Sequence, residues 1–256
     1  MKRVYRIGSW IVAGVGVVAA CITGCPRIKN ALTPDFKETR IYPDENRIAP
    51  PDTVINVNGV PVKMIGVKGG KIDCRGQKKI LELQDFYISE TEVTQELWAA
   101  VMGEIPSVRH AGDSLPVETV DLVACVEFVH KLDSVTGHKF SIPTYPEWLY
   151  AAYLGIGQDE SFPIDSMAWH KYNSNSVSHA VKQKRPDNLG LYDMFGNVEE
   201  WTLSGADPLF MVVGGSFEDE MDGFDADSPD YAHESVATGT IGLRLVSFPE
   251  NSGGDK

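Results

Sequence analysis

The sequence predicts an α+β domain in which regular secondary structure is sparse. Short strand-like segments bounded by turns follow Val60, and three helices are predicted between Thr94 and Ala152. Beyond residue 155 the chain consists mainly of turns, aromatic residues and polar segments, with only short apolar runs. Because the chain has 256 residues and 43% hydrophobic content, it can bury one large core or two small ones.

The N-terminus has the pattern of an export signal. Three cations precede an apolar run from Trp10 to Ala20 that is too short to span a bilayer comfortably. Ile22-Thr-Gly-Cys25 then has the small residues and terminal cysteine of a lipobox, so residues 1–24 are predicted to be a lipoprotein signal peptide and Cys25 the lipidated residue. Cys21 is the alternative, and an uncleaved anchor or an ordinary signal peptide also remains open.

A lipidated N-terminal cysteine implies a protein of the bacterial cell envelope, held by acyl chains in a membrane leaflet. The outer membrane is expected, and the periplasmic face is favoured because Pro26-Arg-Ile-Lys29 contains no acidic cluster. The signal carries three cations and no acid, so its loss changes the net charge from −13 to −16. This acidity argues against nucleic acid as a partner and suits calcium or a basic partner, although solubility alone also explains it.

Residues 25–59 are predicted to be a tether between membrane and domain, because they are rich in Pro, Asp and Asn and show no sustained apolar period. The domain is expected to cover residues 60–248, with residues 249–256 as a tail. Its first strands are predicted at Pro61–Val67 and Ile80–Ile88, on either side of a turn at Gly69-Gly70.

The three helices have recognisable local signals. Thr94 is predicted to cap a helix that ends at Gly103, and a second helix is expected over Leu122–Leu132. The third begins with the capping box Thr144-Tyr-Pro-Glu147. Cys125, in the second helix, is expected to be a small buried hydrophobe, while a disulfide between it and Cys74 is left open.

Seven segments follow one another in the order of a known protein family. They are Phe86–Thr94, Leu115–Val117, Ser141–Trp148, Asn188–Met194, Gly196–Trp201, Gly214–Phe217 and Gly242–Arg244. Together they resemble the formylglycine-generating enzyme, or sulfatase-modifying factor, family over most of the chain after residue 60. The resemblance implies a C-type-lectin-like α+β fold with little regular structure, bound calcium and a peptide-binding cleft.

The resemblance also implies a structural calcium site. The matching positions are Asp193, Gly196, Val198 and Glu200. Two carboxylates and two backbone carbonyls form an oxygen-only set of the kind that calcium prefers. The alternative is that Asp193 caps a turn and Glu200 pairs with a basic side chain. A second family site would fall within residues 173–187, where no ligand can be assigned residue by residue.

The family's oxidase chemistry lacks its essential residues here. The oxidases bind copper through two cysteines that follow the Gly-Gly-Ser-aromatic motif. Asp219 and Phe224 occupy those positions, and no cysteine occurs after Cys125. Because a carboxylate and a phenyl ring cannot replace soft thiolate ligands of Cu(I), copper is not expected. Ser216, which matches an active-site serine, has lost its partners, so a non-catalytic role is favoured and enzymatic activity is left open.

The acidic segment around Phe217 is interpreted as a candidate binding loop. Its residues are Ser216, Glu218, Asp219, Glu220, Asp222, Asp225 and Asp227. The sequence therefore predicts a lipid-anchored envelope module that binds or positions a protein, peptide or glycan. Two alternatives are a divergent oxidase that modifies exported sulfatases and a structural subunit of an envelope secretion or gliding complex.

Overall fold

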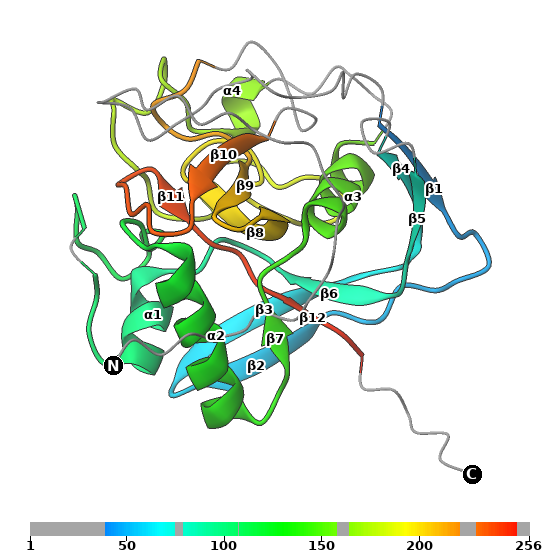
Figure 1. The fold of residues 1–256 in the computed structure, drawn as a ribbon, viewed down its shortest axis with the longest axis horizontal. Coiled ribbons are helices and arrows are strands. Elements are labelled where there is room, and N and C mark those ends of the chain that lie inside the picture. Colours follow the sequence, from blue (N-terminus) through cyan, green and yellow to red (C-terminus); the bar gives the residue numbers. More distant parts are fainter. Residues whose placement is uncertain (1–38, 75–78, 107, 158–163, 221–228, 250–256) are drawn as a thin grey trace.

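The computed structural model describes residues 39–74, 79–106, 108–157, 164–220 and 229–249. Within these residues the strands form three sheets, and four helices lie beside them (Figure 1). The predicted signal peptide, Cys21, Cys25 and residues 26–38 lie outside the described residues, as do residues 250–256 of the predicted tail. No helix in the described part of the chain combines the length and apolar character needed to cross a bilayer.

The largest sheet has five strands, and every neighbouring pair is antiparallel. In spatial order they are β2 (Thr53–Val57), β3 (Val60–Val67), β6 (Phe86–Ser89), β12 (Val246–Ser247) and β7 (Phe140–Ser141). Asn58 and Gly59 connect β2 to β3 with φ values of 50° and 98°. Positive φ at both positions is typical of the type I′ turn that closes two-residue hairpins.

The other two sheets are smaller. One contains, in order, β10 (Asp230–His233), β9 (Leu209–Val213), β8 (Glu199–Ala206) and β11 (Ile241–Gly242). Its β11 runs parallel to β8, and its other pairs are antiparallel. The third sheet, also antiparallel, contains β1 (Arg40–Pro43), β4 (Gly70–Cys74) and β5 (Lys79–Leu83).

The helices are α1 (Gln95–Met102), α2 (Leu122–Thr136), α3 (Tyr145–Ile156) and α4 (Ile164–Met167). The predicted caps are confirmed: Leu97 N donates to Thr94 Oγ1 at 3.2 Å, and Thr144 N donates to Glu147 Oε2 at 2.7 Å. The second helix continues beyond the expected Leu132 to Thr136 and ends at Gly137, which has left-handed backbone geometry.

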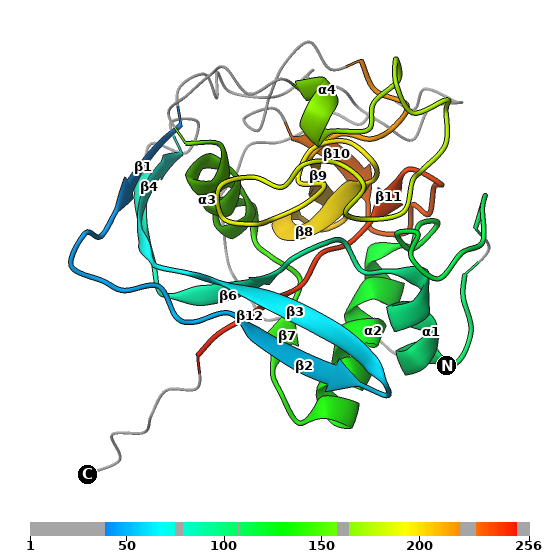
Figure 2. The ribbon, with the colours of Figure 1, turned by 180° about the vertical axis from the view of Figure 1, so that it is seen from behind.

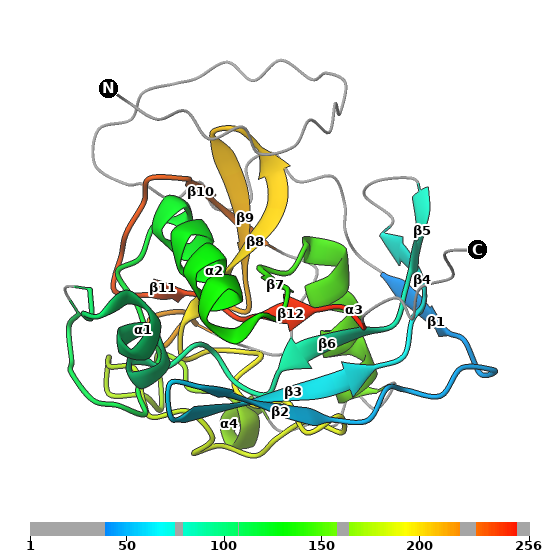
Figure 3. The ribbon, with the colours of Figure 1, turned by 90° about the horizontal axis from the view of Figure 1, so that it is seen from below.

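Two hydrophobic cores hold these layers together. The first surrounds α3, which lies between the three-stranded and four-stranded sheets (Figures 1 and 2), and it includes Trp148 and Phe195. The second packs α1 and α2 against the five-stranded and four-stranded sheets (Figure 3). Phe128 and Trp201 are fully buried in it. Cys125 lies in this second core as a free, buried thiol, so the disulfide with Cys74 is not formed, and burial raises the pKa of Cys125.

Two expectations about the start of the domain need correction. Strands β1 and β2 lie inside the segment that was predicted to be a tether, and they pair with β4 and β3. The folded domain therefore includes residues before 60. The sequence did not indicate these short strands, because prolines around them interrupt the apolar alternation that is typical of a strand. The single strand expected at Ile80–Ile88 is instead divided at Gln84-Asp85 into β5 and β6, which belong to different sheets.

Candidate functional site

The turn from Asp193 to Val198 joins three distant parts of the chain. Gly196 N donates to the carbonyl of Gly214 at 2.9 Å, and Asn197 N donates to the carbonyl of Trp169 at 2.8 Å. Gly196 has a φ of 74°, and a Cβ atom there would lie 2.2 Å from the Trp169 oxygen. Glycine is therefore required at this position by both backbone conformation and space.

Glu200, at the end of this motif, belongs to a buried ion pair. Arg244 Nε lies 2.8 and 3.0 Å from its two carboxylate oxygens, and Trp148 Nε1 donates to Oε2 at 2.7 Å. Arg244 also donates to the carbonyls of Ser89 at 2.9 Å and Tyr192 at 2.8 Å. The Gly-Leu-Arg segment and the Glu-Glu-Trp segment thus meet in the interior, where each satisfies the other's charge and hydrogen-bonding groups.

Asp193 is also buried, but no described residue forms an ion pair of this kind with it. Its Oδ2 accepts from Lys182 N at 2.9 Å, whereas Oδ1 is buried and has no hydrogen-bond partner among the described residues. Burial raises the pKa of Asp193 to about 6. A carboxylate oxygen in this state is the kind of group that water or a cation would satisfy.

Glu92, which sequence reasoning did not single out, completes the buried cluster. Its carboxylate accepts from Asn197 Nδ2 at 3.1 Å and from Val198 N at 3.2 Å. Burial, together with the charges of Asp193 and Glu200, raises the pKa of Glu92 well above its usual value. The only signal for Glu92 was its place in the family-like segment Phe86–Thr94. Three buried carboxyl groups therefore share the field of one guanidinium, Arg244.

The four positions implied for calcium do not fit a shared ion in this arrangement. Asp193 offers a free oxygen, but both oxygens of Glu200 accept from Arg244, and Oε2 accepts from Trp148 as well. A calcium ion bound by all four would have to displace a guanidinium or lie beside it. In the described residues no three His, Cys, Asp or Glu side chains converge on a metal position. Calcium here stays a prediction that depends on movement of Arg244.

Asp219, which matches one of the two copper-binding cysteines of the oxidases, forms hydrogen bonds within its own turn. Ser216 is fully buried, and both its N and its Oγ donate to Asp219 Oδ2, at 2.9 and 2.7 Å. Asp219 N returns a hydrogen bond to the carbonyl of Ser216 at 3.1 Å. Asp219 therefore stabilises a compact turn after β9, because its side chain reaches back to the residue three positions earlier, as the acidic residue of a capping box does.

The neighbouring acids of the candidate binding loop are engaged by cations of the chain itself. Glu218 pairs with Arg109, whose guanidinium also lies 5.5 Å from the centre of the Phe217 ring. Glu220 pairs with Lys171. Asp222, Phe224, Asp225 and Asp227 lie outside the described residues. That this segment binds a partner stays a prediction, and its described acids are already partly neutralised.

Solved structures show the same fold. Treponema denticola variable protein 1 matches with a TM-score of 0.68 and 24% identity, over 78% of this chain and 100% of its own. PvdO from Pseudomonas aeruginosa matches with a TM-score of 0.62 and 16% identity, over 77% of this chain and 98% of its own. CarF has a TM-score of 0.60 and 20% identity, over 74% and 99% of the two chains. These likenesses confirm the predicted α+β, C-type-lectin-like class.

One curated relative is the chaperone protein LppX of Paenibacillus barcinonensis. It is 27% identical over 179 residues, an alignment that covers 48% of this chain and 63% of LppX. The chain thus spans less than two thirds of that relative's length. The model of the sulfatase-modifying factor enzyme 1-like domain matches residues 50–248, and it includes β2 at its start and β12 near its end. The chain therefore belongs to the sulfatase-modifying factor enzyme 1-like domain family.

Proposed function

We propose that this protein is a lipid-anchored module of the cell envelope that binds or positions another polypeptide and does not perform the family's oxidase chemistry. The observation that carries the proposal is the contact of Asp219 with Ser216 N and Oγ. A carboxylate completes the turn where copper chemistry would need a thiolate. Cys125 is a free thiol buried in α2 within the second core.

A binding role is also consistent with the name of the relative LppX, a chaperone protein, since a chaperone handles another polypeptide. The proposed anchor is Cys25, with Cys21 as the alternative, in the outer membrane and on its periplasmic face. The acidic mature chain, with a net charge of −16 after loss of three cations, would attract a basic partner through its long-range field.

Absence of oxidase chemistry is tested with the soluble part of the chain, residues 26–256, supplied with Cu(I), oxygen and a Cys-x-Pro-x-Arg peptide. Mass spectrometry should detect no conversion of the peptide cysteine to an aldehyde. The double variant Asp219→Cys, Phe224→Cys is the matched comparison, and Cu(I) titration should show that it gains a copper site that the wild type lacks. Aldehyde formation by the wild-type protein would overturn the proposal.

The anchor is tested by growing cells with a clickable palmitate and isolating the full-length protein. Label should be present in the wild type and in Cys21→Ser, and absent from Cys25→Ser. Loss of label only in Cys21→Ser would identify the other lipobox. Unlabelled wild-type protein would show that the chain is not lipid-anchored.

A further inference from the structure

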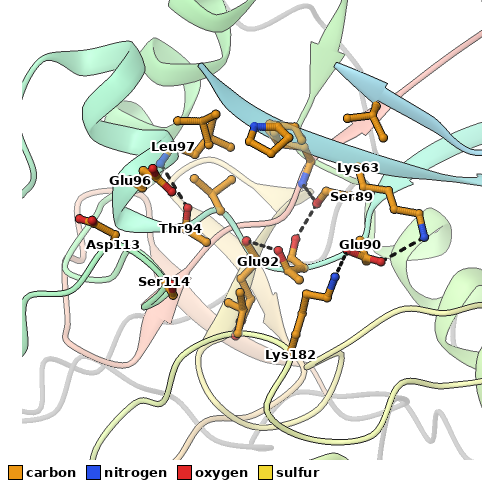
Figure 4. Close-up of a pocket in the computed structure, with 18 residues that line it drawn as sticks. Lys63, Ser89, Glu90, Glu92, Thr94, Glu96, Leu97, Asp113, Ser114 and Lys182 are labelled. Atoms are coloured by element: carbon orange, nitrogen blue, oxygen red, sulfur yellow. Dashed lines mark hydrogen bonds and ion pairs between the residues drawn. The ribbon is translucent and has the colours of Figure 1, made fainter. Parts of the chain in front are cut away.

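A groove opens where strand β6 leaves strand β3. The two strands pair only from Met64 to Val67 of β3. The first residues of β3, next to the hairpin turn, therefore do not pair with β6. A cavity of about 380 Å³ lies there, between the β2–β3 hairpin, the start of α1 and residues 113–114 and 181–182 (Figure 4). We call this cavity the hairpin groove.

The interior of the hairpin groove is apolar. Val62, Val93 and Leu97 line it and are 6%, 1% and 5% exposed, while Val54, at its mouth, is 61% exposed. Such a surface suits the aliphatic part of a long side chain rather than a strongly hydrated group.

The backbone of β3 limits how a ligand can bind. Glu90 N donates to the carbonyl of Lys63 at 2.9 Å, so the main-chain groups of Lys63 face away from β2. Residues two apart in a strand direct their main-chain groups to the same side, so those of Pro61 face that side as well. Because proline has no N–H, an added strand would lack a donor here, and recognition depends on side chains.

The charges of the groove are unevenly satisfied. On one rim, Glu90 pairs with Lys63 at 3.1 Å and with Lys182 at 2.6 Å, and Asp52 lies 3.5 Å from Lys63. The other rim carries two exposed carboxylates, Glu96 and Asp113, which no cation pairs with in the described part of the chain. Glu96 N donates to the carbonyl of Asp113 at 3.2 Å, so the two residues lie side by side.

We propose that the hairpin groove binds a lysine or arginine side chain of an extended segment from a partner protein. The aliphatic stem would lie on Val62 and Leu97, and the cation would reach Glu96 and Asp113. The occupant follows from charge complementarity, because the charge that no described residue pairs with is negative and lies beside an apolar floor. This inference rests on the proposed binding function and adds the place and the chemistry of recognition.

The hairpin itself is fixed to the opposite wall of the groove. Asn58 Nδ2 donates to the carbonyl of Ala100 in α1 at 2.7 Å, and Gly59 N donates to Asn56 Oδ1 at 2.9 Å. The two walls are thereby joined by a direct hydrogen bond.

The test uses the soluble part of the chain, residues 26–256, and a short fluorescent peptide of alternating lysine and serine, with binding followed by anisotropy. The variant Glu96→Gln, Asp113→Asn should bind about tenfold more weakly, because it loses both rim ion pairs with the peptide. The variant Glu82→Gln, Glu127→Gln makes the same change in charge on β5 and α2, and its affinity should change by less than about twofold. Val54→Arg, which puts a cation at the mouth, should also weaken binding.

Equal losses in both double variants would show that only net charge matters and would overturn the proposal. A second peptide, of alternating glutamate and serine, serves as a charge-reversed comparison. If it bound more tightly than the lysine peptide, the proposal would also be overturned. If the lysine peptide still binds the groove variants and is released by Glu218→Gln, Glu220→Gln, the site lies at the turn after β9. That result overturns the groove but leaves the proposed binding function in place, whereas aldehyde formation overturns the function itself.

Discussion

The interior around Arg244 and the hairpin groove both contain carboxylates, but those of the interior are buried beside a cation and those of the groove rim are exposed. Glu200 is held by Arg244 and Trp148 and is fully buried. Glu96 and Asp113 are exposed and have no cation among the described residues. Breaking a buried ion pair is costly, whereas an exposed carboxylate adds little to stability. The comparison indicates that the family motif serves the fold and that the groove charges are free to serve recognition.

The largest effect is expected from Glu200→Gln, which leaves the Arg244 guanidinium buried without its counter-charge. The free energy of unfolding should fall by about 3–5 kcal/mol in urea titrations. Glu127→Gln, which removes an exposed carboxylate that pairs with Lys131, should change it by less than about 0.5 kcal/mol. A loss below about 1 kcal/mol for Glu200→Gln would remove the distinction between interior and groove.

Asp193→Asn tests the unpaired member of the interior cluster. Because burial raises the pKa of Asp193 from 3.8 to about 6, the folded state binds this proton more tightly than the unfolded state. Its contribution to stability is therefore present below about pH 4 and is lost as pH rises to about 6, by about 3 kcal/mol. Asparagine should remove that decline, as measured by urea titrations between pH 4 and 7. If the free energy of unfolding of Asp193→Asn fell between pH 4 and pH 7 as much as that of the wild type, Asp193 would not be the group that causes the decline.

A smaller effect is expected at the closed turn after β9. Asp219→Ala removes the acceptor for two donors of Ser216, so the free energy of unfolding should fall by about 1–2 kcal/mol. Asp219→Asn keeps one side-chain oxygen as an acceptor and should lose less. If both variants are as stable as the wild type, the turn does not depend on this carboxylate.

The change expected from calcium is smaller still. Because Arg244 holds Glu200, addition of calcium followed by a chelator should shift the thermal midpoint by less than about 1 °C. An ion present at about 100 times its dissociation constant would stabilise the fold by about 2.7 kcal/mol, which corresponds to about 5–10 °C for a domain of this size. If calcium raised the thermal midpoint by that amount and Asp193→Asn abolished the rise, the ion would replace Arg244 as the partner of Glu200.

The smallest effect on folding is expected in the groove. Glu96→Gln, Asp113→Asn should change the free energy of unfolding by less than about 0.5 kcal/mol, because both side chains are exposed and pair with no cation of the residues that the structure describes. Urea titration of the same preparation used for peptide binding provides the measurement. A large loss of stability would mean that these carboxylates support the fold and that weakened binding is indirect.

The parts of the fold that follow local rules were predictable. The α1 and α3 starts follow from Thr94 and from the Thr144–Glu147 box, whose partners lie three residues apart. Strand β1 was missed because it depends on pairing with β4, thirty or so residues away, which no local pattern reveals. Strand β2 could have been found, because Asn58-Gly59 is a strong hairpin signal between two strand-like segments.

The site was predictable only in part, for the same reason. The motif positions Asp193 and Glu200 were identified, and so was the alternative that Glu200 pairs with a basic side chain. Its partner Arg244 lies 44 residues away, and the bond from Val198 to Glu92 joins residues 106 apart. Burial and the missing partner of Asp193 Oδ1 are likewise properties of the folded chain. Lipidation at Cys25 lies outside what the structure describes and stays a prediction.

The bond from Asn58 to Ala100 has a consequence for the kinetics of recognition. Because the hairpin and α1 are already joined, the groove needs no rearrangement before it accepts a side chain. The entropy lost through ordering on binding is then lost by the partner segment alone. Association should then be a single bimolecular step, with an observed rate that rises linearly with protein concentration and slows as salt is added. Asn58→Ala should introduce a slower phase that no longer depends on concentration, as the loosened walls come together.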